Sequence, residues 1–117
     1  MVVVTAASGG EEDRLDGVLR VLRERARARN AERVENVTRL LRSGAAGPPT
    51  PEAVLEAASL CHAVAGSAGT FGDDRTTAAA RALETALRAG EHRAVGPSLH
   101  RLRALTTGVG DVRDPGS

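Results

Sequence analysis

The sequence predicts an all-α protein, folded as an antiparallel up-and-down four-helix bundle. Apolar residues recur at the 3.6-residue spacing of an α-helix in long segments of the chain, and the connections between these segments are short. No segment alternates between apolar and polar residues as a strand does, and isoleucine is absent. The 117 residues, of which 41% are hydrophobic and 26% charged, suffice for one domain and are too few for two independent cores.

The first helical segment precedes a linker. Ser8 and Glu11 have the spacing of a capping box, so we expect a helix to begin near residue 9 or 11, after a flexible tail over residues 1–8. Arginines dilute the apolar stripe over residues 27–33, so one long helix and two helices in near alignment both remain open. The stripe consists of Leu15, Leu19, Leu22, Ala26, Val37, Leu40 and Leu41.

The second helix follows the run GAAGPP at residues 44–49, the clearest linker in the chain. Thr50 as N-cap and Pro51 at the first helical position start this helix, which we expect to reach about Phe71. Asp73 or Asp74 then caps the third helix. The third helix continues to about residue 89, with a buried stripe that consists of Ala79, Leu83, Ala86 and Leu87.

The fourth helix begins after Gly90, which ends the third and reverses the chain. Pro97 predicts either a kink in the fourth helix or its first turn. The apolar residues that keep the helical period are Val95, Leu99, Leu102 and Leu105 or Thr106. We expect residues 108–117 to be a disordered tail, so the predicted domain spans residues 9–107.

Charge and composition exclude several classes of protein. The net charge of +1 argues against a dedicated nucleic-acid or membrane partner, and no Trp or Tyr offers a base a stacking surface. The initial MVVVTAAS lacks a basic start and is too short to span a membrane. Cys61 is the only cysteine, which excludes an internal disulfide and fits a reducing cytoplasm. We therefore expect a cytoplasmic monomer.

His62 stands on the second helix opposite its apolar stripe. At about 100° per residue, a set of apolar residues falls within about 60° of the far side: Ala53, Ala57, Leu60, Val64, Ala68 and Phe71. The residues within about 60° of His62 itself are nearly all small: Ala58, Ser59, Ala65, Gly66 and Gly69. His62 is thus predicted to face water on a surface with very short side chains.

Gly66 requires an explanation, because a glycine inside a helix costs about 1 kcal/mol relative to alanine. The favoured explanation is access, since small residues would let a partner or a phosphoryl group reach the imidazole. The alternative is that Gly66, Gly69 and Gly72 simply fray the end of the helix.

The chain lacks most parts of an enzyme: it has no Ser/His/Asp set, no P-loop and no metal-ligand spacing among its histidines and cysteine. What remains is the His62 imidazole, a nucleophile that can accept a phosphoryl group. His92 and His100 are expected to be surface residues, and Cys61 points about 100° away from His62.

These residues resemble the histidine-containing phosphotransfer (HPt) domain of bacterial phosphorelays. The resemblance rests on His62, Gly66 at i+4, the small run at residues 67–70, Phe71-Gly72, and Leu83-Glu84 one helix later. It departs at two positions: Ala65 stands where the family commonly has Lys or Arg, and Asp73 stands where an apolar residue is usual.

The resemblance implies an HPt-like bundle, with a short extra N-terminal helix as an open alternative, and a phosphoryl carrier rather than an enzyme. His62 would accept a phosphoryl group from a receiver-domain aspartate or from a sensor or hybrid histidine kinase, and pass it to a response-regulator receiver. The partner receiver would supply Mg²⁺, so the chain itself would hold no cofactor or metal.

The small residues around His62, together with Leu55, would form the docking surface for that partner. Leu55 lies about 20° from His62 and two turns earlier. An HPt-like binding module that docks a kinase or receiver without being phosphorylated is the alternative function. The dimerisation region of a histidine kinase is disfavoured, because AVAGSAG follows His62.

Overall fold

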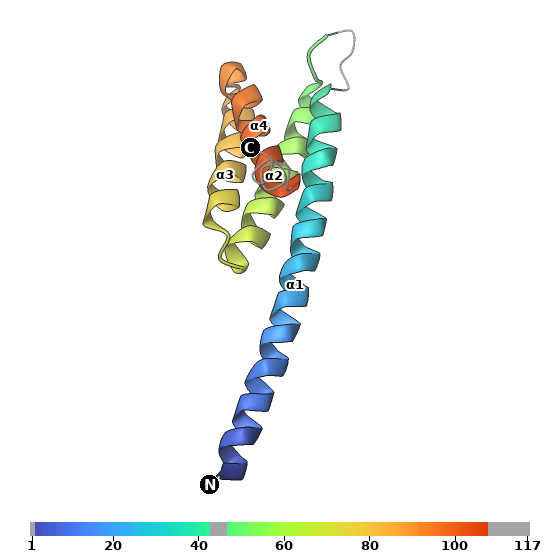
Figure 1. Ribbon diagram of the computed structural model, residues 1–117. Coiled ribbons are helices and arrows are strands. Elements are labelled where there is room, and N and C mark those ends of the chain that lie inside the picture. Colours follow the sequence, from blue (N-terminus) through green and yellow to red (C-terminus); the bar gives the residue numbers. More distant parts are fainter. Residues whose placement is uncertain (1, 43–46, 108–117) are drawn as a thin grey trace, which may run out of the picture.

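The computed structural model describes residues 2–42 and 47–107, and this part of the chain contains four α-helices and no strand (Figure 1). The helices are α1 (Val2–Arg42), α2 (Pro51–Thr70), α3 (Asp74–Ala89) and α4 (His92–Thr107). The predicted all-α class is confirmed.

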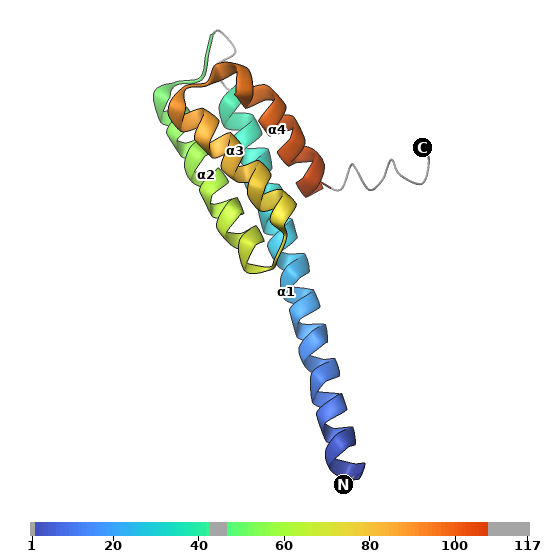
Figure 2. The same cartoon turned by 90° about the vertical axis from the view of Figure 1, so that its left-hand side faces the viewer.

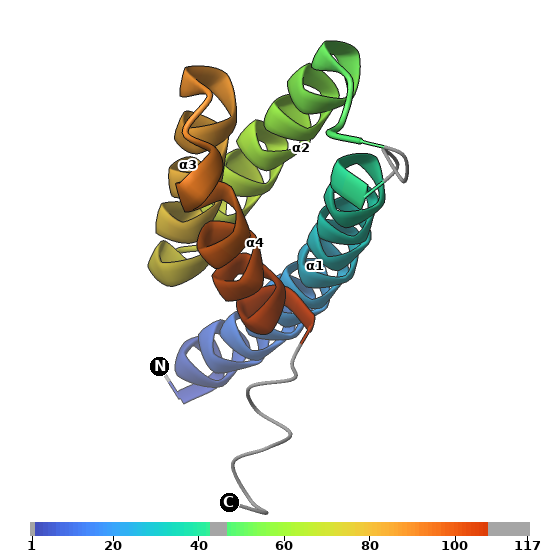
Figure 3. The same cartoon turned by 90° about the horizontal axis from the view of Figure 1, so that it is seen from above.

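Each helix packs against its neighbours in the chain, and α4 returns to α1 to close the bundle (Figure 3). The fully buried side chains come from all four helices, and the largest are Leu83, Leu102, Val34, Val37, Val64 and Cys61. The core is therefore built from small and medium-sized aliphatic residues, as the near absence of aromatics requires.

The start of α2 and both ends of α3 fall where the capping residues predict them. The Thr50 hydroxyl accepts a hydrogen bond from the Ala53 amide (3.1 Å), and the Asp73 carboxylate accepts one from the Thr76 amide (3.2 Å). Asp73 is thus the cap of α3, which decides between the two predicted aspartates. Gly90 ends α3 at φ 70°, a left-handed conformation that glycine adopts without strain.

α1 is one continuous helix, with neither a break near residues 27–33 nor a separate leading helix. Ala26, Asn30 and Val34 are buried at helical spacing through the arginine-rich stretch. The buried Asn30 amide donates to Ser67 Oγ (3.2 Å) and accepts from Arg33 Nη1 (2.9 Å). A polar residue can occupy this core position because its hydrogen bonds are made.

The start of α1 differs from the prediction. The helix begins at Val2 rather than near residue 9 or 11, so residues 2–8 are helical where a tail was expected, and its N-terminal half projects beyond the bundle (Figure 2). Leu15 and Leu22 are consequently 58% and 41% exposed. A helix of 41 residues is about 60 Å long, whereas the 20 residues of α2 span about 30 Å, so none of the other described helices covers this part of the stripe.

α4 contains Pro97 in its interior. The helix begins at His92, five residues before Pro97. The alternative in which Pro97 marks the first turn of the helix is therefore wrong. Leu102 is the fully buried residue of the predicted stripe, while Val95, Leu99 and Leu105 are half-buried against the core. The tail predicted for residues 108–117 lies outside the described residues.

Candidate functional site

His62 lies in the middle of α2 with its side chain 77% exposed, as predicted. Its ring reaches across to α3, where Nδ1 lies 3.3 Å from both carboxylate oxygens of Glu84. The exposed imidazole therefore has one nitrogen held by a carboxylate.

The buried face of α2 explains why His62 meets α3. Four of the predicted stripe residues are buried, while Leu60 and Phe71 are only half-buried. The complete buried set is Ala53, Ala57, Ala58, Cys61, Val64, Ala65 and Ala68. The centre of this buried set is rotated by about 50° around the helix from the centre of the predicted stripe, towards α3. His62 thus stands at the edge of the exposed face rather than in its middle.

Two of the predicted docking residues are buried and offer a protein partner almost no surface. Ala58 is 0% and Ala65 5% exposed, because α2 packs against α3 on this flank as well as against α1. The docking role predicted for these two residues is therefore wrong. The remaining members of the predicted surface are exposed, namely Leu55, Ser59, Gly66 and Gly69.

Gly66 is not required by packing within the protein. A Cβ atom built at Gly66 meets nothing within 4 Å, whereas one at Gly69 would lie 3.6 Å from Thr77 Oγ1, an ordinary contact. α2 continues to Thr70, and the Thr70 hydroxyl donates to the Gly66 carbonyl (2.9 Å). The helix therefore does not fray at Gly66, and the glycine leaves open space one turn from the imidazole.

Side chains of α2 and α3 line a hollow of about 500 Å³ beside the imidazole. The lining residues are His62, Ala65, Gly66, Arg81, Glu84, Thr85 and Arg88. The hollow thus combines one nucleophile, one carboxylate and two guanidinium groups.

Glu84 connects His62 with Arg88. Arg88 Nε donates a hydrogen bond to Glu84 Oε2 at 2.9 Å. Partial burial acts to raise the pKa of Glu84, but hydrogen bonds and charge from Arg88 and His62 outweigh it, and the pKa lies below its ordinary value. Glu84 is therefore ionised at neutral pH and can only accept hydrogen bonds. The nitrogen that faces it, His62 Nδ1, must carry the proton, which leaves the lone pair on Nε2.

Cys61 takes no part in this chemistry. The residue is fully buried, and burial, together with the charge of Glu84, raises the pKa of the Cys61 thiol to about 12 against the opposite effect of Arg88. A protonated thiol is a poor nucleophile. His92 and His100 are exposed, as predicted.

Other kinds of site find no support in the described part of the chain. No three His, Cys, Asp or Glu side chains gather there as metal ligands. None of the helices described is both long and apolar enough to cross a membrane.

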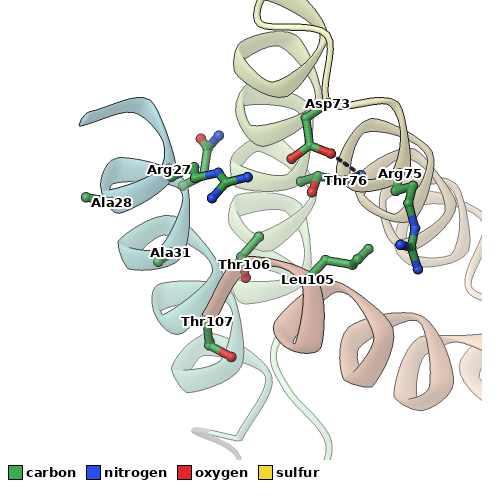
Figure 4. Close-up of a pocket in the computed structure, with 10 residues that line it drawn as sticks. Arg27, Ala28, Ala31, Asp73, Arg75, Thr76, Leu105, Thr106 and Thr107 are labelled. Atoms are coloured by element: carbon green, nitrogen blue, oxygen red, sulfur yellow. Dashed lines mark hydrogen bonds between the residues drawn. The ribbon is translucent and has the colours of Figure 1, made fainter. Parts of the chain in front are cut away.

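A second hollow, of about 490 Å³, lies between α1, the start of α3 and the end of α4 (Figure 4). Arg27 and Arg75 line it together with Asp73. The Asp73 carboxylate caps α3, as the dashed line in Figure 4 marks. This hollow has neither histidine nor cysteine among its lining residues and offers a phosphoryl group no comparable acceptor.

Glu84 is part of the family resemblance, but the sequence pattern assigns no role to Glu84, Arg81 or Arg88. The available signal is the i,i+4 pair of Glu84 and Arg88, next to the buried Leu83, which places both charges at the border of the core. The pattern does not say which neighbouring helix they face.

A helical bundle that presents one exposed, carboxylate-oriented imidazole beside an open, arginine-lined hollow has the construction of a histidine phosphocarrier. The model of one protein family, described as Hpt domain, matches residues 17–112, and the chain belongs to this family. No curated protein and no solved structure gives a significant match. Hpt domains are phosphotransfer modules of two-component signalling that interact with receiver domains and kinases, and they are phosphocarriers rather than catalytic enzymes.

Proposed function

We propose that His62 accepts a phosphoryl group from the aspartate of a receiver domain, or from a kinase, and passes it to a response-regulator receiver in a phosphorelay. The observation that carries this proposal is the contact of 3.3 Å between Nδ1 of the exposed His62 ring and the Glu84 carboxylate. This contact fixes the tautomer in which Nε2 is the free nucleophile.

The transfer is a direct displacement at phosphorus. The Nε2 lone pair forms the N–P bond while the P–O bond to the donor aspartate breaks, and the aspartate leaves as a carboxylate. The proton on Nδ1 stays in place, so the ring becomes a positively charged N-phosphorylimidazolium. Glu84 faces this developing charge and stabilises it without any rearrangement. Transfer to the next receiver reverses the same step.

The partner supplies the remaining parts. We expect Mg²⁺ to be held by the receiver domain, beside the aspartate that carries the phosphoryl group, where it neutralises the charge of the transferring oxygens. The receiver approaches the exposed face of α2. Leu55, 57% exposed, and Ser59 lie on this face before His62, and Gly66 and Gly69 lie after it.

Incubation of the protein with a phosphorylated receiver domain tests the proposal. We expect acid-labile, base-stable phosphate on His62, located by mass spectrometry of peptides, and its loss from the receiver at the same rate. Binding of the receiver without phosphate on His62 would overturn the proposal and support the non-phosphorylated docking module instead.

A further inference from the structure

We propose that Arg81 binds the phosphoryl group carried by His62, so that the hollow between α2 and α3 is a phosphoryl pocket whose cation comes from α3. This inference rests on the proposed function of His62. It names a contact that neither the family match nor the sequence pattern assigns to this residue.

The register of the two antiparallel helices places Arg81 next to the open side of His62. Thr77 Oγ1 donates to the Ala65 carbonyl at 3.5 Å, and Glu84 contacts His62. Residue 81 lies between these two levels on α3, beside the stretch from His62 to Gly66. All of these side chains except Thr77 line the same hollow.

The two arginines of the hollow differ in what they bind. Arg88 Nε already donates to Glu84 at 2.9 Å, one turn further along α3. Arg81 is exposed, and within residues 2–42 and 47–107 the structure records no hydrogen bond or ion pair for its guanidinium group. Arg81 is therefore the cation that can turn to a new anion without breaking an existing pair.

A phosphoryl group on Nε2 is such an anion. It brings up to two negative charges and three acceptor oxygens to a ring that otherwise carries one proton. A guanidinium group presents paired N–H donors at the spacing of phosphate oxygens, so Arg81 can bind two of them at once. The glycine at position 66 leaves the intervening space open.

Ala65 cannot supply this contact. Its side chain has no donor, and it is 5% exposed because α3 covers it. A long basic side chain at this position would have to start inside the α2–α3 interface. We therefore expect the positive charge next to the phosphoryl group to come from α3, the helix that covers Ala65.

Phosphorylation by inorganic phosphoramidate tests Arg81 without any protein partner. In this reaction the P–N bond of phosphoramidate breaks, ammonia leaves, and the new N–P bond forms at His62 Nε2. The variants are Arg81→Ala and Arg81→Lys, with Arg75→Ala as the matched control, since Arg75 is an exposed α3 arginine that lines the other hollow.

We expect Arg81→Ala to slow phosphorylation about three- to tenfold, the range for one charge-assisted hydrogen bond at an exposed site. The ³¹P resonance should also show that the bound phosphoryl group titrates at a pH higher by about 0.5, because a neighbouring positive charge has been removed. In Arg81→Lys, which keeps the positive charge, the phosphoryl group should titrate at nearly the same pH as in the wild type. Arg75→Ala should behave as the wild type.

An Arg81→Ala protein that matches the wild type in both rate and ³¹P titration would overturn the inference, and so would an Arg81→Lys protein that titrates like Arg81→Ala. Neither result affects the proposed function. Absence of phosphate from His62 in the wild type, with phosphoramidate and with a phosphorylated receiver, would instead remove the proposed function itself.

Discussion

Two hollows in the described part of the molecule have nearly the same size, about 500 and 490 Å³, and each is lined by two arginines and one carboxylate. They differ in what the carboxylate does. Glu84 holds a histidine ring in the first hollow, whereas Asp73 caps a helix in the second. Volume and charge therefore do not identify the functional site. The group that the carboxylate contacts identifies it, because only Glu84 contacts a histidine ring.

The position of each carboxylate follows from its place in α3. Asp73 precedes the first turn, where backbone amides without partners attract a carboxylate. Glu84 lies in the middle of the helix, where the amides are already bonded, so its side chain is free to contact the neighbouring helix. Variants in the two hollows should therefore differ in their effect on phosphorylation.

The largest effect is expected at His62. His62→Gln should abolish phosphorylation by a receiver, because His62 is the only histidine among the residues that line the hollow. Arg27→Ala, in the second hollow, should leave the rate unchanged. Phosphate retained by His62→Gln, measured by radiolabel incorporation, would show that the acceptor is elsewhere.

Gly66→Leu should reduce phosphorylation about a hundredfold, because a side chain over the imidazole displaces the donor from attack geometry. The fold should persist, since a Cβ atom here meets nothing within 4 Å. Gly66→Ala is the control. It should keep the rate and raise the free energy of unfolding by up to about 1 kcal/mol. A normal rate in the Leu variant would refute the access explanation.

Glu84→Gln should slow phosphorylation about tenfold, because a charged hydrogen bond to the ring is replaced by a neutral one. The substitution should also change the pH dependence of stability. The pKa of Glu84 is lowered in the folded state, so its stabilising contribution is present above its ordinary pKa and is lost as the pH falls through the folded value.

Acid titration followed by circular dichroism measures this contribution. We expect the wild type, and not Glu84→Gln, to lose that part of its stability on acidification. Glu91→Gln, at an exposed carboxylate just before α4, serves as the control for both measurements. Identical rates in the Glu84 and Glu91 variants would remove the distinction between the two hollows.

Leu55→Arg should slow transfer from a phosphorylated receiver about fivefold, because an apolar contact worth about 1 kcal/mol is lost at the interface. Phosphorylation by phosphoramidate, which needs no docking, should stay the same. Val21→Arg changes another exposed aliphatic residue, 43% accessible and far from His62 in α1, and is the control. Equal slowing by both donors would show that Leu55 acts on the site itself.

The smallest effect on transfer is expected at Asp73. Asp73→Ala removes the N-cap of α3 and should lower the free energy of unfolding by about 1 kcal/mol, as measured by urea denaturation. The rate of phosphorylation should remain within error of the wild type. A slower rate in the folded variant would mean that the second hollow contributes to transfer.

Much of this architecture can be predicted from local patterns. Thr50 and Gly90 mark helix ends because their capping chemistry depends only on neighbouring residues. The exposure of His62 follows from the small and polar residues at adjacent helical positions. These features need no knowledge of how the helices are placed relative to one another.

The rest depends on that placement. Ala58 and Ala65 belong to an open face when α2 is considered alone, yet α3 covers them. The contact between His62 and Glu84 joins residues 22 positions apart and depends on the same rotation of α2. The apolar stripe of α1 likewise continues past the point where its neighbours end, because a helical period carries no information on their lengths.

The burial of Cys61 gives the protein a practical property. Its thiol is fully enclosed, and because its pKa is about 12, maleimide reagents at neutral pH will find no thiolate there while the bundle is intact. A cysteine introduced in place of Leu55 would then be the single labelling position on the surface. A fluorophore attached to it would report the arrival of a partner at α2 while the native cysteine stays in place.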